Sequence, residues 1–331
     1  ERLQLIHAHG IKNVRVLDRT FNYNPRRAKE LLRLFLEFHP DIRFHLEIHP
    51  ALLSEELKEE LSLLPKGLLH LEAGIQSLRE PVLEKSRRMG KLSDALDGLR
   101  FLCALPNMET HAALIAGLPL YHLHEIFEDV RTLAGYAAGE IQLESLKLLP
   151  GTEMRRRAEE LGIKYSPLPP YEVLQTHEIS VSELQTARQL LDGFYNTPAW
   201  QALTRELILN DEQFLHRFLA YLTKANLIDQ PMSLEKRGLI LYEFCKQNYP
   251  EYQIQAAIAW IEAGMSLKKL PAEKVWTKRQ IPPATWNIIY GEYKESLRLC
   301  FLPADEKGEH GYWFGFESEI QKASPVFKAR T

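Results

Sequence analysis

The sequence has few cysteines, and these are widely separated. Its 331 residues contain three, at Cys103, Cys245 and Cys300. This spacing fits neither a disulfide framework nor a metal-binding cysteine motif, and it is typical of a reducing cytosol. We therefore expect a cytoplasmic protein.

The sequence also lacks an excess of charge and a long apolar run. Its 41 basic and 44 acidic residues give a formal net charge of −3, which offers no electrostatic footprint for nucleic acid or an anionic membrane surface. No apolar stretch approaches the roughly 20 residues of a membrane span. We expect a small-molecule or peptide substrate, with no nucleic acid and no membrane as partner.

What the sequence does contain is a repeated alternation of short β-rich runs and longer helical runs, from Ile11 to about Leu161. This alternation predicts βαβ units and a parallel sheet. The expected strands lie near Val14–Asp18, Arg43–His49, Leu68–Ile75, Thr110–Ala116 and Ile141–Lys147. The expected helices lie near Pro25–Phe38, Ser54–Leu63, Glu80–Arg87, Ser93–Ala104, Leu123–Ala137 and Thr152–Leu161.

The second strand distinguishes two possible α/β architectures. In RFHLEIH, from Arg43 to His49, polar and apolar residues alternate, whereas a central strand of a doubly wound sheet is apolar on both faces. One polar face fits a barrel whose interior holds a ligand. We predict an α/β fold with a partial (β/α) barrel of about five parallel βα units.

A change of composition predicts a second domain. The proline-rich stretch SPLPPYE, from Ser166 to Glu172, reads as a linker. We expect the partial barrel in residues 1–165 and a mainly helical domain in residues 166–331. Within this domain, LRLCFLP and GYWFGF predict a small β unit between about Trp286 and Phe316, with the turn-rich DEKGEHG between them.

Polar residues and glycines recur where the predicted strands end, which is the edge that carries chemistry in parallel βα folds. Each has a structural alternative. Asp18 could cap a turn, Glu47 and His49 could be a solvated strand end, and the glycine before Gln76 could serve close packing. The residues at these ends are Asp18, Arg19, Thr20, Glu47, His49, Gly74, Gln76, Ser77, Gly117 and Lys147.

Taken together, these stretches resemble the radical S-adenosylmethionine superfamily, in the branch of the oxygen-independent coproporphyrinogen oxidases and the cobalamin-dependent enzymes. VRVLDRTFNYNPRRAKELL, LEIHPALLSEELKEEL, LEAGIQSLREPVLEKSRR and ALIAGLP are similar to successive strand motifs of that branch. ESLKLLPGTEMRRRAEELGIKYSPLPPYEVLQT and the helical domain after it resemble a C-terminal domain of unknown function. The motifs are fairly specific for the superfamily and not for a substrate.

The resemblance implies a set of S-adenosylmethionine-binding residues. Asp18, Arg19 and Thr20, at the end of the first predicted strand, would bind the methionine amino group. Glu47 and Gln76 would contact the ribose, beside Ser77. Arg88, twelve residues after Gln76, matches the family arginine near the methionine portion. The implied set is Asp18, Arg19, Thr20, Glu47, Gln76, Ser77, Arg88, Ile115, Ala116 and Gly117, of which the last three would accommodate adenine.

Two departures from the family pattern qualify this expectation. The CxxxCxxC run that holds the 4Fe-4S cluster is absent, so we expect an inactive fragment that lacks the cobalamin domain, the first strand and the cluster loop. Ala113 stands where the family commonly has aspartate. Cobalamin and the cluster would belong to the parent protein, and the edge of the strand at Val14–Asp18 would pair with a second copy or another neighbour.

The expected parent is therefore an iron-sulfur enzyme of methyl transfer or oxidative cyclisation, of the kind labelled magnesium-protoporphyrin IX monomethyl ester oxidative cyclase. Two alternatives remain open. One is an unrelated (β/α) barrel lyase or hydrolase that uses Glu47, His49 and Lys147. The other is a degenerate binding module in which Ala113 marks lost catalysis.

Overall fold

A computed structural model of the chain describes residues 1–88, 90–136, 139–228, 230–270, 272, 275–277, 287–290, 298–304, 310–316 and 327–330. The chain divides into two compact units. Unit 1 comprises residues 1–196 and 208–219, and unit 2 comprises residues 197–207 and 220–331. The first unit thus continues past the proline-rich stretch at Ser166–Glu172.

Unit 1 is built on a five-stranded sheet in which every neighbouring pair is parallel. The strand order β1-β2-β3-β4-β5 follows the chain, as expected for a partial barrel, and the predicted α/β architecture is confirmed. The strands are β1 (Asn13–Arg15), β2 (Arg43–Ile48), β3 (Leu69–Gln76), β4 (Glu109–Ala116) and β5 (Glu140–Ser145).

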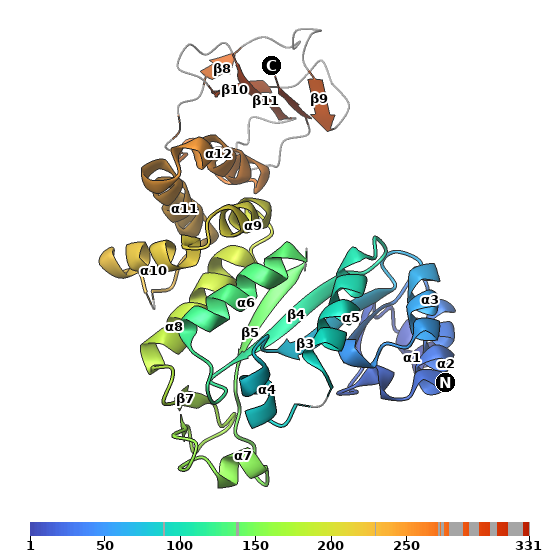
Figure 1. Cartoon of the computed structure of the whole chain (residues 1–331). Helices are drawn as coiled ribbons and strands as arrows, with labels where there is room; N and C mark the ends of the chain where they lie inside the picture. Colours follow the sequence, from blue (N-terminus) through green and yellow to red (C-terminus); the bar gives the residue numbers. More distant parts are fainter. Residues whose placement is uncertain are drawn as a thin grey trace. The chain divides into compact units, whose positions relative to one another are not determined.

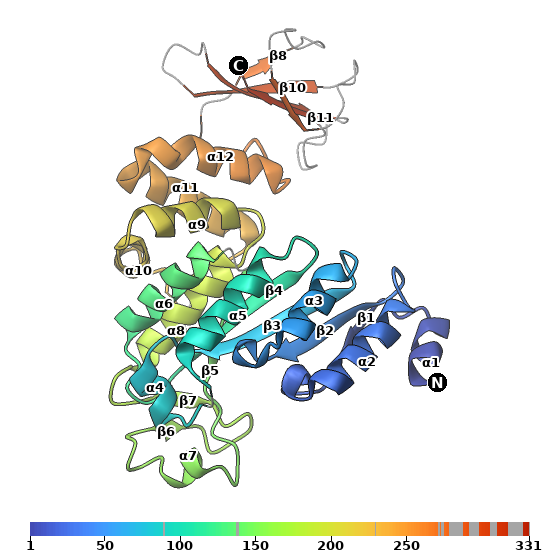
Figure 2. The same cartoon turned by 45° about the vertical axis from the view of Figure 1, so that its right-hand side comes forward.

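Helices connect these strands and cover one face of the sheet. Right-handed crossovers between strands that are consecutive in the sheet carry every helix to the same side, and Figures 1 and 2 show α2, α3, α5 and α6 along that face. The helices are α1 (Arg2–Ala8), α2 (Pro25–Leu36), α3 (Glu55–Leu63), α4 (Glu80–Lys85), α5 (Leu92–Ala104) and α6 (Leu123–Gly135), with 3-10 turns η1 (Phe21–Tyr23) and η2 (Pro50–Leu52).

Local sequence explains where the helices begin. Asn24 precedes Pro25, and its side chain accepts a hydrogen bond from the Arg27 amide at the start of α2. Ser54 caps α3 in the same way through the Leu57 amide. Such caps satisfy amide groups that have no partner within the helix. The predicted helix end at Ala137 lies outside the described residues.

The alternation of the strands separates a buried face from a polar face. In β2, Phe44, Leu46 and Ile48 are buried, and the residues between them are partly exposed. In β3, the buried residues are Leu69, Leu71, Ala73 and Ile75. Because successive strand residues point to opposite faces, the apolar set packs beneath the helices and the polar set lines the other side.

The predicted helix at Thr152–Leu161 is wrong for most of its length. Only α7 (Glu153–Arg156) is helical, and turns follow it. Ala158, Leu161 and Ile163 pack with Leu148 and Val173 in a small hydrophobic cluster. The apolar spacing that resembles a helix is therefore satisfied by irregular turns over this cluster.

After the turns, the chain covers the outer edge of β5. A short hairpin, β6 (Lys164–Tyr165) and β7 (Val173–Gln175), leads to α8 (Val181–Leu190) and the π-helical turn η3 (Leu191–Tyr195). The Asn196 side chain donates to the Ile141 carbonyl at 2.9 Å and accepts from the Ile141 amide at 3.0 Å. The Asn196 side chain thus makes the two hydrogen bonds with Ile141 that a neighbouring strand would otherwise make at the edge of β5.

Unit 2 contains helices and a small antiparallel sheet. The helices are α11 (Leu234–Asn248) and α12 (Gln253–Glu262), with the 3-10 turn η4 (Pro250–Tyr252); α9 (Gln201–Asn210) and α10 (Phe214–Lys224) each contribute residues to both units. The sheet has the order β8-β10-β11-β12-β9. Its strands are β8 (Val275–Thr277), β9 (Asn287–Tyr290), β10 (Arg298–Pro303), β11 (Gly311–Phe316) and β12 (Phe327–Arg330).

The predicted small β unit is confirmed where it can be compared, since β10 and β11 pair as antiparallel strands. Trp286 and residues 305–309 of the predicted turn lie outside the described residues. Among the helices within the described ranges, none has the length and apolar character that a bilayer crossing requires.

Candidate functional site on the polar face of the sheet

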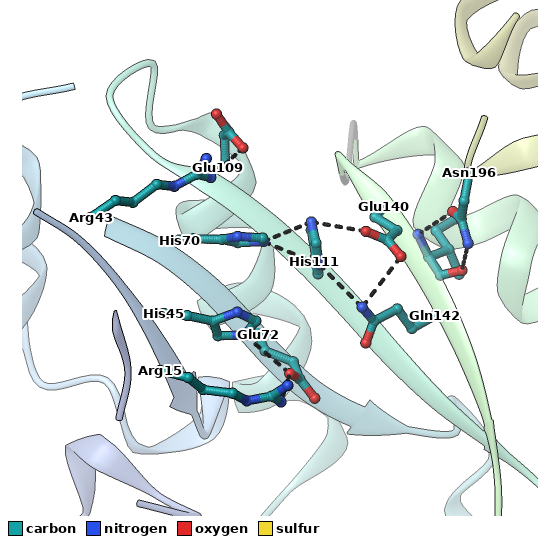
Figure 3. Close-up of polar contacts among 11 residues, drawn as sticks. Arg15, Arg43, His45, His70, Glu72, Glu109, His111, Glu140, Gln142 and Asn196 are labelled. Carbon is teal, nitrogen blue, oxygen red and sulfur yellow. Dashed lines mark hydrogen bonds and ion pairs between the residues drawn. The ribbon is translucent and has the colours of Figure 1, made fainter. Parts of the chain in front are cut away.

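The face of the sheet opposite to the helices carries a concentration of polar side chains, which we call the polar face. Figure 3 shows several of its residues joined by hydrogen bonds and ion pairs. Its members come from every second position of the five strands: Asn13, Arg15, Arg43, His45, Glu47, His70, Glu72, Gly74, Glu109, His111, Ala113, Ile115, Glu140, Gln142 and Glu144. Gln76 ends β3 after a shift in register.

The amino-terminal half of the polar face contains a chain of hydrogen bonds through two imidazoles. His111 Nε2 lies 3.1 Å from Glu140 Oε2 and 2.7 Å from His70 Nε2, which also lies 3.1 Å from His111 Nδ1. A carboxylate only accepts hydrogen bonds, so we assign the Nε2 proton of His111 to the bond with Glu140. His111 Nδ1 then accepts from Gln142 Nε2 at 3.3 Å, His70 Nε2 faces the same Nε2 proton as an acceptor, and both imidazoles are neutral.

Burial holds these imidazoles in their neutral form. It lowers the pKa of His70 to about 4, with further lowering by His111 and His45. It likewise lowers the pKa of His111 to about 4, with a smaller contribution from His45. Neighbouring imidazoles disfavour a second positive charge for the same Coulombic reason.

Ion pairs organise the residues around the histidines. Arg15 Nη2 donates to Glu72 Oε2 at 2.8 Å and lies 3.5 Å from Glu47 Oε1. His45 Nε2 is 3.2 Å from the same Glu72 oxygen, and Arg43 pairs with Glu109. Glu72 thus fixes side chains from β1 and β2, and the predicted ribose residue Glu47 stands at the border of this network.

At the carboxyl-terminal half, β3 ends in an irregular backbone. Gln76 has φ +74°, which a residue other than glycine rarely adopts. The pairing of β3 with β4 shifts between Gly74 and Gln76, so Ile75 is an extra residue in the strand. A bulge redirects the side chains that follow it. The irregularity therefore falls on the residue that the sequence singles out for ribose binding.

Arg88 lies against the same strand end. Its Nη2 donates to the Gly74 carbonyl at 2.8 Å, and burial lowers its pKa. Within the described part of the chain, no carboxylate forms an ion pair with it. The structure thus places the partly buried positive charge of Arg88 against Gly74, two residues before Gln76.

The residues after β1 form a turn of their own. The Asp18 carboxylate accepts from Arg27 Nη1 at 2.6 Å and from the Thr20 amide at 3.3 Å. The bond with Arg27 holds the pKa of Asp18 below its ordinary value. Arg19 is exposed and Thr20 is partly buried. Asp18 therefore supports the turn before α2, which is the structural alternative raised by the sequence.

Ser77 is completely buried, and its hydroxyl lies 3.4 Å from Asp129 on α6. Asp129 also accepts from the Tyr121 hydroxyl at 2.6 Å and from the Leu78 amide at 2.8 Å. Burial raises the pKa of Asp129, and the bond from Tyr121 opposes that rise. In this arrangement, Ser77 helps to hold the loop after β3 on α6.

At the end of β4, Ile115 is partly exposed on the polar face, whereas Ala116 is fully buried on the other face. Gly117 has φ +86°, and a Cβ there would lie 3.0 Å from Val173 Cγ1. Its backbone conformation favours glycine, and a side chain here would also crowd Val173. Gly117 therefore has a packing role that does not depend on a ligand.

The lyase or hydrolase alternative would use His49 and Lys147 together with Glu47, but each of the first two has other contacts in the structure. His49 is buried, and its backbone is held by two hydrogen bonds of 2.8 Å to the Asn22 side chain. Lys147 lies in a β-bridge with Glu172, and its ammonium is 3.6 Å from Glu144. The described structure joins neither of them to Glu47 by a hydrogen bond or ion pair.

The cysteines do not form a ligand set for an iron-sulfur cluster. Cys103 is on α5 of unit 1, whereas Cys245 and Cys300 are buried in unit 2. Burial raises the pKa of Cys245 to about 12, so it stays a thiol at neutral pH, and thiolates are the form that binds metal. Among the described residues, no group of three or more histidine, cysteine or acidic side chains could hold a metal ion.

The sequence interpretation missed the amino-terminal half of the polar face, namely His70, Glu72, His111, Glu140 and Gln142. It considered only strand ends. The alternation recognised in RFHLEIH could have found them, because the same period of two on β3, β4 and β5 places each of them on the face that carries His45.

Comparison with family models gives one match, described as "Protein of unknown function (DUF4080)", over residues 159–280. It covers well under half of the chain, and its description assigns no activity. No curated protein matches the chain.

Solved structures give more distant similarities. The radical S-adenosylmethionine methyltransferase TsrM from Kitasatospora setae is 20% identical over 57% of this chain and 38% of its own, with a TM-score of 0.42. Elp3 from Methanocaldococcus infernus is 11% identical over 95% and 72%, with a TM-score of 0.41. Coproporphyrinogen III oxidase (HemN) from Escherichia coli is 13% identical over 66% and 73%, with a TM-score of 0.32.

This chain therefore spans little more than a third of the methyltransferase. The similarities are distant, with TM-scores below 0.5, and none of them supports an argument about the activity of this chain.

Proposed function

We propose that unit 1 binds S-adenosylmethionine at the carboxyl-terminal half of the polar face, as part of a radical S-adenosylmethionine enzyme of the cytosol. The proposal rests on the structure at the end of β3. There a bulge, the positive φ of Gln76 and the half-buried Arg88 coincide. Strained backbone of this kind costs roughly 1–3 kcal/mol and is concentrated at functional sites.

The chemistry of these residues fits the parts of the cofactor. Arg88 is a partly buried cation with no carboxylate partner among the described residues, and it would pair with the methionine carboxylate. Glu47 accepts hydrogen bonds and the Gln76 amide both donates and accepts, so together they suit two ribose hydroxyls. Ile115 would supply an apolar surface for adenine.

Ala113 limits this site. It is opposite Gly74 in the pairing of β3 with β4, and its side chain is almost fully buried. A methyl group accepts no hydrogen bond, so the ribose contacts would rest on Glu47 and Gln76 alone. We expect weaker binding than a site with aspartate at position 113 would give, and an Ala113→Asp variant should bind more tightly.

The iron-sulfur cluster does not fit the cysteines of this chain, and we derive no step through it. In the proposed enzyme, the polar face binds and orients the cofactor, and the cluster and cobalamin are held elsewhere in the parent protein. Methyl transfer or oxidative cyclisation is the proposed reaction class, on a small-molecule or peptide substrate.

Calorimetric titration of the whole chain with S-adenosylmethionine tests this proposal. We expect Arg88→Gln to weaken binding at least about tenfold and Gln76→Ala to weaken it about two- to tenfold, since a hydrogen bond to a charged group contributes roughly 1.5–3 kcal/mol and one between neutral groups roughly 0.5–1.5 kcal/mol. Gln142→Ala is the matched control, because Gln142 is on the same face in its amino-terminal half.

Three results would count against the site. They are absence of binding by the wild type, equal binding by Gln76→Ala, or an equal loss in Gln142→Ala. Circular dichroism of each variant separates a lost contact from a lost fold.

A further inference from the structure

A cavity in unit 1 is lined by residues none of which belongs to the polar face. Its volume is about 670 Å³, and it is lined by the end of α7, the turns after it and the β6–β7 hairpin. These elements are labelled in the lower part of Figure 2. The volume is within the range of clefts that bind small molecules.

The floor of this cavity is part of a packed core. Ala158 and Ile163 line it and belong to the hydrophobic cluster with Leu148, Leu161 and Val173. Each of these five residues is at most 7% exposed. Because this cluster is closely packed, it gives the cavity a rigid apolar floor. The other lining residues are mainly polar.

A glycine shapes one wall. Gly162 has φ +64°, and a Cβ at this position would lie 2.0 Å from Cδ2 and Nε2 of His177. The absence of a side chain lets the imidazole of His177 lie directly against the backbone. Both residues line the cavity.

Arg155 is held in place before any ligand arrives. Its Nη1 donates to the Leu148 carbonyl at 2.9 Å. Its Cζ lies 5.1 Å from the ring centroid of Tyr165 and 4.7 Å from that of Tyr171. Cation–π contacts and a carbonyl fix the guanidinium without neutralising it, and the remaining donors of the fork stay available.

The charge of the cavity is unbalanced. Arg155, Arg156 and Lys164 line it, against the single carboxylate of Glu159. Neighbouring Arg157 pairs with Glu153 and Glu160, and Arg87 pairs with Glu153. For the three cations of the cavity, by contrast, the described residues provide no ion-pair partner.

We propose that this cavity binds a small molecule through an anionic oxygen group, phosphoryl or carboxylate, which contacts Arg155, Arg156 and Lys164. The planar fork of arginine matches both groups in geometry, and lysine adds a point charge. The apolar floor would contact the rest of the ligand. This site is independent of S-adenosylmethionine binding at the polar face, and it lies partly in the segment that matches the family model of unknown function.

Calorimetric titration of the whole chain tests the site, with inorganic pyrophosphate as the phosphoryl probe and succinate as the carboxylate probe. Both titrations are run at constant ionic strength, because surface charges are screened by salt. The test variant is the double substitution Arg156→Gln and Lys164→Gln. The control is Arg26→Gln with Lys66→Gln, which removes two exposed charges elsewhere in unit 1.

We expect the wild type and the control to bind at least one probe equally well. The double variant in the cavity should bind at least about tenfold more weakly, since each charge-assisted hydrogen bond is worth roughly that factor or more. The probe that binds more tightly identifies the group that the site prefers. The proposal is overturned if the wild type binds neither probe, if the cavity variant binds like the wild type, or if the control loses affinity equally.

Discussion

His70 and His111 make the stability of unit 1 depend on pH. Their pKa is about 4 in the folded chain, against 6.5 for an ordinary histidine. Between these values the unfolded chain binds more protons than the folded chain, so the free energy of unfolding rises with pH. We predict that stability decreases progressively as the pH falls from about 6.5 towards about 4.

Urea denaturation at about pH 7 and about pH 5 checks this prediction. The double variant His70→Gln with His111→Gln should lose much of the difference between the two conditions. His9→Gln, at an exposed position, should keep it. The same pH difference in all three proteins would show that the two imidazoles do not cause it.

Gly117 offers a second prediction at the residue scale. Alanine at φ +86° is strained, and its Cβ would lie 3.0 Å from Val173 Cγ1. We expect Gly117→Ala to lower the free energy of unfolding by about 1–3 kcal/mol. In a Val173→Ala background the loss should be smaller, because the steric contact is relieved and only the strained φ remains. An equal loss in both backgrounds would exclude the steric part.

At the scale of elements, Asn196 completes the edge of β5. Removing its amide leaves the Ile141 amide and carbonyl without their side-chain partner. An unsatisfied buried polar group costs roughly 1–3 kcal/mol. We therefore predict that Asn196→Ala lowers the free energy of unfolding by about this amount and speeds hydrogen exchange at the Ile141 amide.

The matched control is Asn13→Ala, at an exposed position of β1. It should leave both measurements close to those of the wild type. Unchanged exchange at Ile141 in Asn196→Ala would mean that this side chain does not protect the edge.

The elements that could be predicted from the sequence are those with a regular period. All five parallel strands were predicted as short β-rich runs between helical runs, and the alternation of polar and apolar residues in β2 predicted its two faces. The stretch after α7 misled the same reasoning. Ala158 and Leu161 have helical spacing, but the cluster around Leu148 and Val173 draws them into turns. Such a competition between local pattern and distant packing is not visible in the sequence.

The candidate site was predictable to a similar extent. The position of Gln76 at a strand end follows from the sequence, whereas its positive φ depends on the bulge between β3 and β4. The burial of Ser77 against Asp129 depends on a residue 52 positions away. Contacts of this range have no local pattern, and Asn196 was missed for the same reason. His70 and His111 differ, because the alternation of β3 and β4 could have placed them on the polar face.

At the scale of the whole molecule, β1 stands at the edge of the described sheet. The amide of Val16 donates to His45, and the Lys12 carbonyl accepts from Arg43. By the alternation of a parallel ladder, the amides of Asn13 and Arg15 point away from β2. An edge with free amides invites another strand, so we predict that two copies of the chain pair through β1.

Sedimentation equilibrium over a range of concentrations measures this association. Asn13→Pro removes an outward amide without affecting the ladder to β2, and it should weaken association. Asn13→Ala keeps the amide and should associate like the wild type. A wild-type chain that stays monomeric throughout would rule out this pairing.

The amide of Asn196 also has a consequence for synthesis of the chain. Strands β1 to β5 pair in the order in which they leave the ribosome, so each new strand finds its neighbour already made. The last edge is different, because Ile141 is protected by a side chain 55 residues later. At roughly 5–20 residues per second, the edge of β5 remains uncovered for roughly 3–11 s after it is synthesised. During that interval, the exposed edge of the nascent chain would be most prone to pair with another chain that is being synthesised on the same mRNA.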